Sequence, residues 1–209
     1  DLYGQMHSST GEKVGEEFLV NTEFLAAANY GSVTSLSNGN FVVAWQSQND
    51  PDPSSSPGEP LEYSFHARIY NSTGEALGEQ FQINTEKSDF IEASNSVIPE
   101  QVLSIAPLEE GKFAAVWRAN EDGEFDVSQS DNLHNGIFGQ IFDNDGSKIG
   151  AEFKVNTYDK SIGWEAQSFE FGQSAPNVTS LADGGFLVSW TSADNNQGGD
   201  GLDVFAQRF

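Results

Sequence analysis

Two kinds of apolar pattern recur along the chain, and both are typical of β-strands. In residues 41–45, FVVAW, every position is apolar. Because successive side chains of a strand lie on opposite faces, this run predicts a strand with both faces buried. In residues 153–155, Phe153 and Val155 flank a polar residue, which indicates a strand with one face toward a core. The first pattern predicts a strand inside stacked sheets, and the second predicts an outer strand.

Both patterns belong to longer blocks that the chain repeats. One block occurs three times, as GEKVGEEFLVNT (11–22), GEALGEQFQINT (74–85) and GSKIGAEFKVNT (146–157). A second also occurs three times, as SVTSLSNGNFVVAWQS (32–47), QVLSIAPLEEGKFAAVWRA (101–119) and NVTSLADGGFLVSWTS (177–192). A third occurs four times, as LYGQMHSSTG (2–11), FHARIYNSTG (65–74), IFGQIFDNDG (137–146) and VFAQRF (204–209). The chain is therefore a repeat protein.

Each unit is interpreted as four short strands, named a to d. Strands a and b flank tight turns such as Asn38-Gly39 and Asp183-Gly184. Strand c carries a small residue at one position in every copy, which predicts a close contact there. These residues are Gly4, Ala67, Gly139 and Ala206. Strand d is the outer strand. The middle unit departs most, because residues 106–110 lengthen its a–b turn. In the third block, Arg68 stands where the other copies have Gln.

The predicted fold is all-β, a β-propeller-like array of four-stranded antiparallel units. A β-sandwich or another stacked-sheet repeat is the alternative, and the units look too long for a trefoil. The division is 1–22 (strands c and d), 23–85, 86–157 and 158–209 (strands a, b and c), within one continuous repeat domain. Trp45, Trp117 and Trp190 end equivalent strands, so we expect all three to be buried between sheets.

The two ends of the chain are copies of one element. Residues 2–7 and 204–209 both correspond to strand c, and a ring of three units cannot use both in the same place. We therefore expect at least one of these edges to be unpaired or to pair with another molecule, since exposed edges favour strand addition. The chain is interpreted as a segment of a longer array or as one that self-associates through edge strands.

Three motifs, G-x-x-F-x-[VI]-N-T, D-G-G-F-x-V-x-W and F-x-Q-x-F-D, carry a resemblance that covers nearly the whole chain. It resembles repeats of very large extracellular bacterial proteins, of the kind found beside hemolysin-type calcium-binding (RTX) segments in adhesins, and of ciliate surface proteins. The resemblance implies an extracellular or cell-surface location. It also implies an architectural or adhesive module, because such repeats share no set of catalytic residues.

Charge and composition further narrow the classes of function that the chain could have. A formal net charge of −23 disfavours nucleic acid as a partner, and no apolar run approaches the roughly 18 residues that would predict membrane insertion. The chain has no Cys and no hydrolase or phosphate-binding motif, so we expect no enzyme. The alternative is a carbohydrate-active enzyme or its accessory domain, because a chance pair of carboxylates could serve a glycosidase. His7 and His66 are interpreted as structural, and His134 as a loop residue that could reach a metal.

Long connections between the strands are the predicted binding region. In an antiparallel meander the short a–b and c–d turns lie at one edge, and the long connections lie at the other, with most of the 32 acidic residues. Variable loops on a rigid scaffold are where binding usually occurs. Tyr30, Phe90 and Trp164 are the candidate ligand-binding residues, for a glycan or a cell-surface protein. The alternative is that these are simply solvated acidic loops.

Calcium is the predicted ion, because hard oxygen ligands are abundant there and no Cys or His cluster competes. Residues 198–206, GGDGLDVFA, match the G-G-x-G-x-D-x-U-x nonapeptide of calcium-binding β-rolls. The match occurs once, and an ordinary loop into strand c remains the alternative. The candidate metal ligands are Asp194, Asp200 and Asp203 in one loop and Asp122, Glu124, Asp126 and Asp131 in another.

Overall fold

A computed structural model describes residues 1–22, 27–49, 61–85, 88–90, 102–120, 135–157, 173–192 and 203–209. These residues form strands and one 3-10 turn. The strands are β1 (Tyr3–His7), β2 (Lys13–Leu19), β3 (Ala27–Ser35), β4 (Phe41–Asn49), β5 (Leu61–Tyr70), β6 (Phe81–Gln82), β7 (Ser88–Phe90), β8 (Leu103–Pro107), β9 (Phe113–Asn120), β10 (Asn135–Phe142), β11 (Lys148–Lys154), β12 (Gln173–Ser180), β13 (Phe186–Ser192) and β14 (Asp203–Arg208). The 3-10 turn, η1 (Glu109–Gly111), is the lengthened a–b turn of the middle unit. None of the described helical segments is long and apolar enough to cross a membrane.

The strands form four antiparallel sheets, which we call A to D. Sheet A is β1-β2, sheet B is β3-β4-β5-β6, sheet C is β8-β9-β10-β11 and sheet D is β12-β13-β14. The a-b-c-d order predicted from the repeats is therefore confirmed, with strands c and d alone in sheet A and strands a, b and c in sheet D. β7 also pairs with β5, so residues 88–90, which the sequence division assigned to the second unit, extend sheet B.

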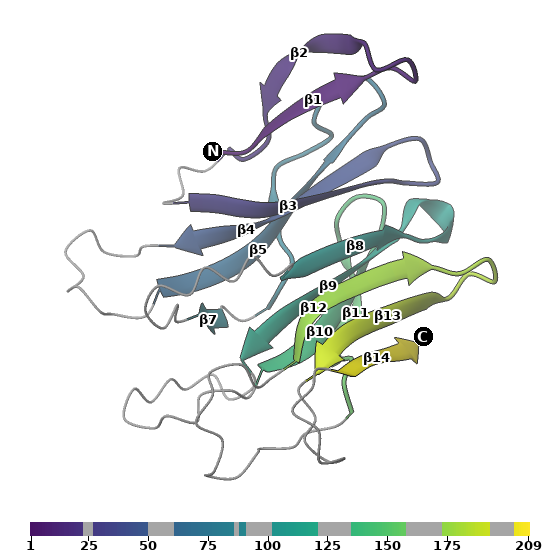
Figure 1. The fold of residues 1–209 in the computed structure, drawn as a ribbon. Coiled ribbons are helices and arrows are strands. Elements are labelled where there is room, and N and C mark those ends of the chain that lie inside the picture. The colour runs from purple at the N-terminus through teal and green to yellow at the C-terminus, as the bar shows by residue number, and fades with distance from the viewer. Residues whose placement is uncertain are drawn as a thin grey trace.

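The sheets stack one after another, with sheet A at one end and sheet D at the other (Figure 1). Strand β4 shows why this stacking is possible, because its two faces serve two different cores. Trp45, with Phe41 and Val43, packs toward sheet A, and Val42 and Ala44 pack toward sheet C. The all-β, propeller-like array of antiparallel units is thus confirmed, as an open stack.

The three repeated tryptophans lie between sheets, as predicted. Trp45 is 0% exposed, Trp117 is 1% exposed and Trp190 is 8% exposed. Trp190 lies in the last sheet, which has a neighbour on one side only among the described residues.

An aromatic trio joins each pair of neighbouring sheets. The first residue of strand b stacks on the last aromatic of strand c, as in Phe113 and Phe142, whose ring centroids lie 4.9 Å apart. The Phe of strand d in the preceding sheet then tilts onto that pair, as Phe81 does at 5.6 Å from Phe142. The same trio occurs at the other two junctions. Its members there are Phe18, Phe41 and Tyr70 between sheets A and B, and Phe153, Phe186 and Phe209 between sheets C and D.

The small residue of strand c sits beneath the phenyl ring of strand d. A Cβ added at Gly139 would lie 2.8 Å from Cζ of Phe153, and one at Gly4 would lie 2.6 Å from Cζ of Phe18. In both sheets the register shifts directly after this glycine, between Gly139 and Ile141 and between Gly4 and Met6. The close contact expected from the sequence is therefore confirmed, and a β-bulge accompanies it.

Strands extend further into the long connections than the sequence predicted. β4 continues to Asn49 and β5 begins at Leu61, although their facing ends are polar. Gln46 and Ser47 are nevertheless buried, and strand pairing provides partners for their backbone groups. Tyr30 and Phe90, which the sequence placed in loops, lie in β3 and β7.

Candidate functional site

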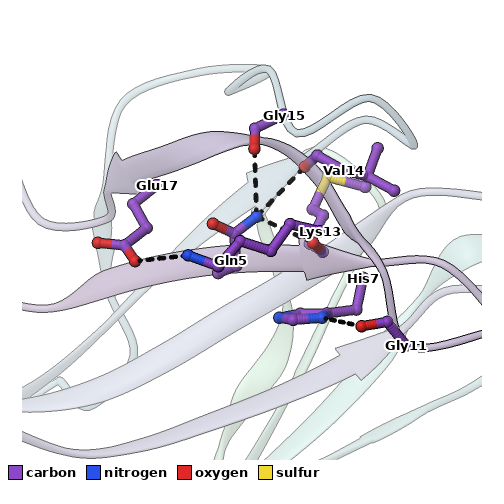
Figure 2. Close-up of polar contacts among 8 residues, drawn as sticks. Gln5, His7, Gly11, Lys13, Val14, Gly15 and Glu17 are labelled. Atoms are coloured by element: carbon purple, nitrogen blue, oxygen red, sulfur yellow. Dashed lines mark hydrogen bonds and ion pairs between the residues drawn. The ribbon is translucent and has the colours of Figure 1, made fainter.

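Gln5 is the first of the recurring polar residues, and it holds strand c to strand d. Its Nε2 donates to the carbonyl oxygens of Met6 at 2.9 Å, Val14 at 3.3 Å and Gly15 at 3.4 Å (Figure 2). The contacts lie at the β-bulge, where the shift in register leaves carbonyl groups outside the regular ladder. This side chain therefore replaces ladder hydrogen bonds that the bulge removes.

Gln140 repeats the arrangement in sheet C. Its Nε2 donates to the carbonyl oxygens of Ile141 at 2.9 Å, Ile149 at 3.0 Å and Gly150 at 3.5 Å. Gln140 is fully buried, whereas Arg68 in sheet B reaches one strand d carbonyl, that of Gly78, at 2.9 Å. The sequence marked these positions as equivalent but gave no role for them, because the bulge that needs the amide is visible only in the register of the strands.

The Asn of the V-N-T block performs a second structural task. The side-chain oxygen of Asn156 accepts a hydrogen bond from the backbone N–H of Ile137 at 2.7 Å. Asn84 accepts from Phe65 at 2.8 Å, in the same way. Asn21 accepts from Leu2, also at 2.7 Å. Each Asn therefore ties the end of strand d to strand c in its own sheet.

The two described histidines have structural partners, in agreement with the sequence interpretation. His7 Nδ1 donates to the carbonyl oxygen of Gly11 at 3.0 Å, in the turn after β1 (Figure 2). His66 Nδ1 lies 3.1 Å from the hydroxyl oxygen of Ser47, and its ring stacks on Trp45. His134 lies outside the described residues.

Tyr70 is the buried titratable group with the clearest perturbation. Burial raises the pKa of its hydroxyl, and the nearby Arg68 guanidinium partly opposes that rise. The hydroxyl donates to the carbonyl oxygen of Val20 at 3.1 Å, so it links sheet B to the last residues of the N-terminal hairpin. The raised pKa follows from burial of the hydroxyl at a structural junction and does not mark a proton-transfer group.

A hollow of about 430 Å³ lies between sheet A and sheet B. Its lining is mostly apolar and comes from β1, the end of β2 and the facing parts of β3 and β4. The lining residues are Leu2, Tyr3, Gly4, Gln5, Met6, His7, Phe18, Val20, Gly31, Ser32, Val33, Phe41 and Val43. The lining contains no Asp or Glu, so it offers no acid and base pair of the glycosidase kind.

Most of the sequence-predicted site residues lie outside the described part of the chain. These are Trp164, Asp122, Glu124, Asp126, Asp131, Asp194 and Asp200. Asp203 is described as the exposed first residue of β14. Within the described segments, no three His, Asp or Glu side chains lie close enough together to hold a metal ion.

Comparison with solved structures finds proteins of similar fold. No family model matches the sequence, and no curated protein matches it. A solved structure of Penicillium chrysogenum alpha-L-arabinanase complexed with arabinobiose is similar, with 11% sequence identity and a TM-score of 0.35. The alignment covers 87% of this chain and 62% of the arabinanase chain. A likeness at this TM-score carries no argument about function.

Proposed function

We propose that this chain is a non-enzymatic repeat module of an extracellular surface or secreted protein. Its stacked sheets form a rigid support, and its long acidic connections bind a glycan or a cell-surface protein, with calcium held among their carboxylates. The alternative is that the chain is a carbohydrate-active enzyme. The described residues contain no set of catalytic side chains that supports this alternative.

The observation that carries this proposal is that the recurring polar residues form hydrogen bonds between strands. Gln5 and Gln140 donate to strand d carbonyls, and Asn21, Asn84 and Asn156 accept backbone N–H groups of strand c. The residues of this repeated motif use their hydrogen bonds to join strands, so the motif specifies the architecture. Function then rests on what differs between units, which is the set of long connections.

Charge supports the choice of calcium as the ion. The chain carries 32 acidic residues against nine Lys and Arg, and the acids are concentrated in the connections. Repulsion between neighbouring carboxylates raises their free energy unless a cation or water separates them. Oxygen ligands of this kind suit calcium, which accepts six to eight of them in flexible geometry.

Two measurements on the full chain test the proposal. The first is a glycan array with and without millimolar calcium, on which we expect saturable binding that chelator weakens. The second is thermal unfolding across a calcium series, because an ion that binds only the folded state raises the unfolding midpoint as its concentration rises. The matched variants are Asp200→Asn and Asp126→Asn, which should reduce that rise, with Asp183→Asn in a short turn as the control.

Opposite results would reject separate parts of the proposal. Release of reducing sugar from a polysaccharide panel would establish the enzymatic alternative. An unfolding midpoint that stays constant across millimolar calcium would remove the ion. An absence of binding to glycans and to cell-surface extracts would leave a structural spacer.

A further inference from the structure

The c–d turn of sheet B contains the tripeptide Asn71-Ser72-Thr73, which matches the N-x-[ST] acceptor pattern of N-linked glycosylation. The turn directly follows β5, which ends at Tyr70. The corresponding turns of sheets A and C contain SST (8–10) and DND (143–145), and neither of these fits the pattern. Among the three described c–d turns, the acceptor pattern therefore occurs in sheet B alone.

The three turns share one backbone shape. In sheet B the N–H of Asn71 donates to the carbonyl oxygen of Glu75 at 2.9 Å, and the N–H of Gly74 donates to the carbonyl oxygen of Asn71 at 3.0 Å. The same two hydrogen bonds close the turns that begin at Ser8 and Asp143. The turns therefore differ in the side chain at their first position and not in their backbone.

The first residue of the turn supplies an oxygen acceptor to the backbone. Asn71 Oδ1 accepts from the N–H groups of Thr73 and Glu75, both at 2.9 Å. In sheet A, Ser8 Oγ accepts from the two equivalent N–H groups at 3.3 and 3.2 Å. Side-chain oxygens of Asn, Asp and Ser commonly support turns in this way. Because a hydroxyl does in sheet A what the amide oxygen does in sheet B, the turn does not require the amide nitrogen of Asn71.

The amide nitrogen of Asn71 is the atom that carries the sugar in an N-linked glycan, and its surroundings are exposed. Asn71 Nδ2 donates to a carboxylate oxygen of Glu75 at 2.8 Å, in an exposed contact. Ser72 and Thr73 are exposed as well. The hydroxyl that the pattern requires lies on the same turn, since Thr73 Oγ1 donates to Asn71 Oδ1 at 2.7 Å. A bond to Nδ2 leaves Oδ1 and one N–H in place, so the turn keeps the hydrogen bonds that close it.

Asn71 also lies far from the predicted binding region. β5 runs from Leu61, where the long connection from β4 enters, to Tyr70, which precedes the turn. Ten residues of strand at about 3.3 Å each place the two ends about 30 Å apart. A glycan on Asn71 is therefore attached at the end of sheet B opposite to this long connection.

We propose that Asn71 is an N-glycosylation site, a role that rests on the extracellular location of the proposed function. In the transfer, Asn71 Nδ2 forms a bond to the anomeric carbon of an oligosaccharide and loses one proton to a base of the transferase. The bond from that carbon to the phosphate of a lipid diphosphate donor breaks, and the lipid diphosphate leaves. The attached glycan is bulky and hydrated, so it keeps neighbouring molecules away from this edge of sheet B.

A second match to the pattern, Asn177-Val178-Thr179, has different surroundings. Asn177 lies inside β12 and is paired with Ser189 of β13. The next residue, Val178, is buried, and its N–H donates to Ser104 Oγ of sheet C at 3.2 Å. This site lacks the exposed residues that follow Asn71 in its turn, so the proposal is confined to Asn71.

Peptide mapping by mass spectrometry tests the site on the protein isolated from the cells that make it. The peptide that contains Asn71 should carry hexosamine and hexose, and enzymatic release of the glycan in heavy-oxygen water should convert Asn71 to labelled Asp. An unmodified peptide from the secreted protein, or a glycan on Asn177 alone, would overturn the proposal. Recovery of the protein from the cytosol would instead contradict the extracellular location on which the proposal rests.

Matched variants of the chain, passed through a eukaryotic secretory pathway, separate the glycan from the fold. Asn71→Ser places the side chain of the sheet A turn in sheet B, so it should lose the glycan and keep the thermal midpoint of the deglycosylated chain. Thr73→Ala should also lose the glycan, because it removes the hydroxyl that the acceptor pattern requires. Thr10→Ala, the matching change in the turn of sheet A, should leave the mass of the glycan unchanged.

A gain of glycan in a second turn gives the sharpest control. Ser8→Asn creates the pattern N-S-T in the turn of sheet A, which has the same backbone hydrogen bonds, so this variant should carry one more glycan than the wild type. Intact mass before and after enzymatic deglycosylation measures the difference. A glycan at position 8 of this variant beside an unmodified Asn71 would show that the turn of sheet B excludes the transferase, and it would overturn the proposal.

Discussion

Sheets C and D share three corresponding strands of the repeat, and they differ in what surrounds those strands. Ile137 in β10 is 0% exposed, whereas Val204 at the matching position in β14 is 78% exposed. Neither strand buries this residue by itself; β11 and the following sheet do so for Ile137. In a stacked array, burial is therefore a property of neighbouring units, and stability approximates a sum of unit and interface terms.

The largest expected difference between these sheets is at the repeated tryptophans. Trp117→Ala should cost about 3–5 kcal/mol, because it opens a cavity in the core between sheets B and C. Trp190→Ala should cost less, because that side chain lies in the terminal sheet and is already 8% exposed. Urea unfolding followed by circular dichroism measures both. Equal costs would show that the terminal junction is packed as tightly as the central one.

Gln140 and Gln207 provide the next comparison. Gln140→Ala removes a buried amide and leaves strand d carbonyls at the bulge without their donor, so we expect a loss of about 1–3 kcal/mol. Gln207→Ala should change the free energy of unfolding by about 0.5 kcal/mol or less, since its amide contacts only its own strand. Urea unfolding followed by circular dichroism measures both changes. A similar loss at both positions would mean that the amide acts within strand c alone.

Much of this architecture was predictable, because apolar and small residues recur at fixed positions of the repeats and indicated which positions are buried. The apolar run of residues 41–45 predicted a strand with two buried faces, and the small residue at Gly139 predicted a close contact, which Phe153 makes in the structure. The extent of the strands was not predictable. Gln46 and Ser47 are buried and paired within the sheet, and their polar character gave no sign that the strand continues.

The candidate site was harder to predict, for two physical reasons. The hollow is lined by residues of β1 to β4 from two different sheets, and the sequence does not show how far apart two stacked sheets lie. The role of Gln5 depends on a shift in register after Gly4, which sequence spacing does not show. The predicted acidic ligands lie in connections whose lengths differ between units, so the repeats supplied no template for them.

Tyr70 and Phe142 extend the comparison to the inter-sheet junctions. They occupy the same position, but the Tyr70 hydroxyl also donates to the carbonyl of Val20. Tyr70→Phe makes the first junction resemble the second and should cost about 1 kcal/mol, the usual net value of one hydrogen bond.

The pH dependence of this contact has a definite sign. Burial raises the pKa of Tyr70 above its ordinary value of 10.0, so its contribution is fully present below pH 10. The contribution is lost as pH rises through the higher folded-state pKa. Chemical unfolding between pH 8 and pH 11 should therefore show the difference between wild type and Tyr70→Phe shrinking at the alkaline end. A constant difference over that range would assign the effect to packing.

The smallest expected effect is in the c–d turns, where sheets B and C use different side chains for one task. In sheet C the carboxylate of Asp145 accepts from the backbone N–H of Ser147 at 2.9 Å, and in sheet B the amide oxygen of Asn71 accepts from the N–H groups of Thr73 and Glu75. Hydrogen bonds from the Ser147 hydroxyl and backbone lower the pKa of Asp145 below its ordinary value of 3.8. The stability that this charge contributes is present above pH 3.8 and is lost as pH falls through the lower folded-state pKa. Asp145→Asn should thus lower the thermal midpoint slightly at pH 7, and the two proteins should converge near pH 2, as followed by circular dichroism. A gap of the same size at both pH values would mean that the shape of the side chain, and not its charge, holds the turn.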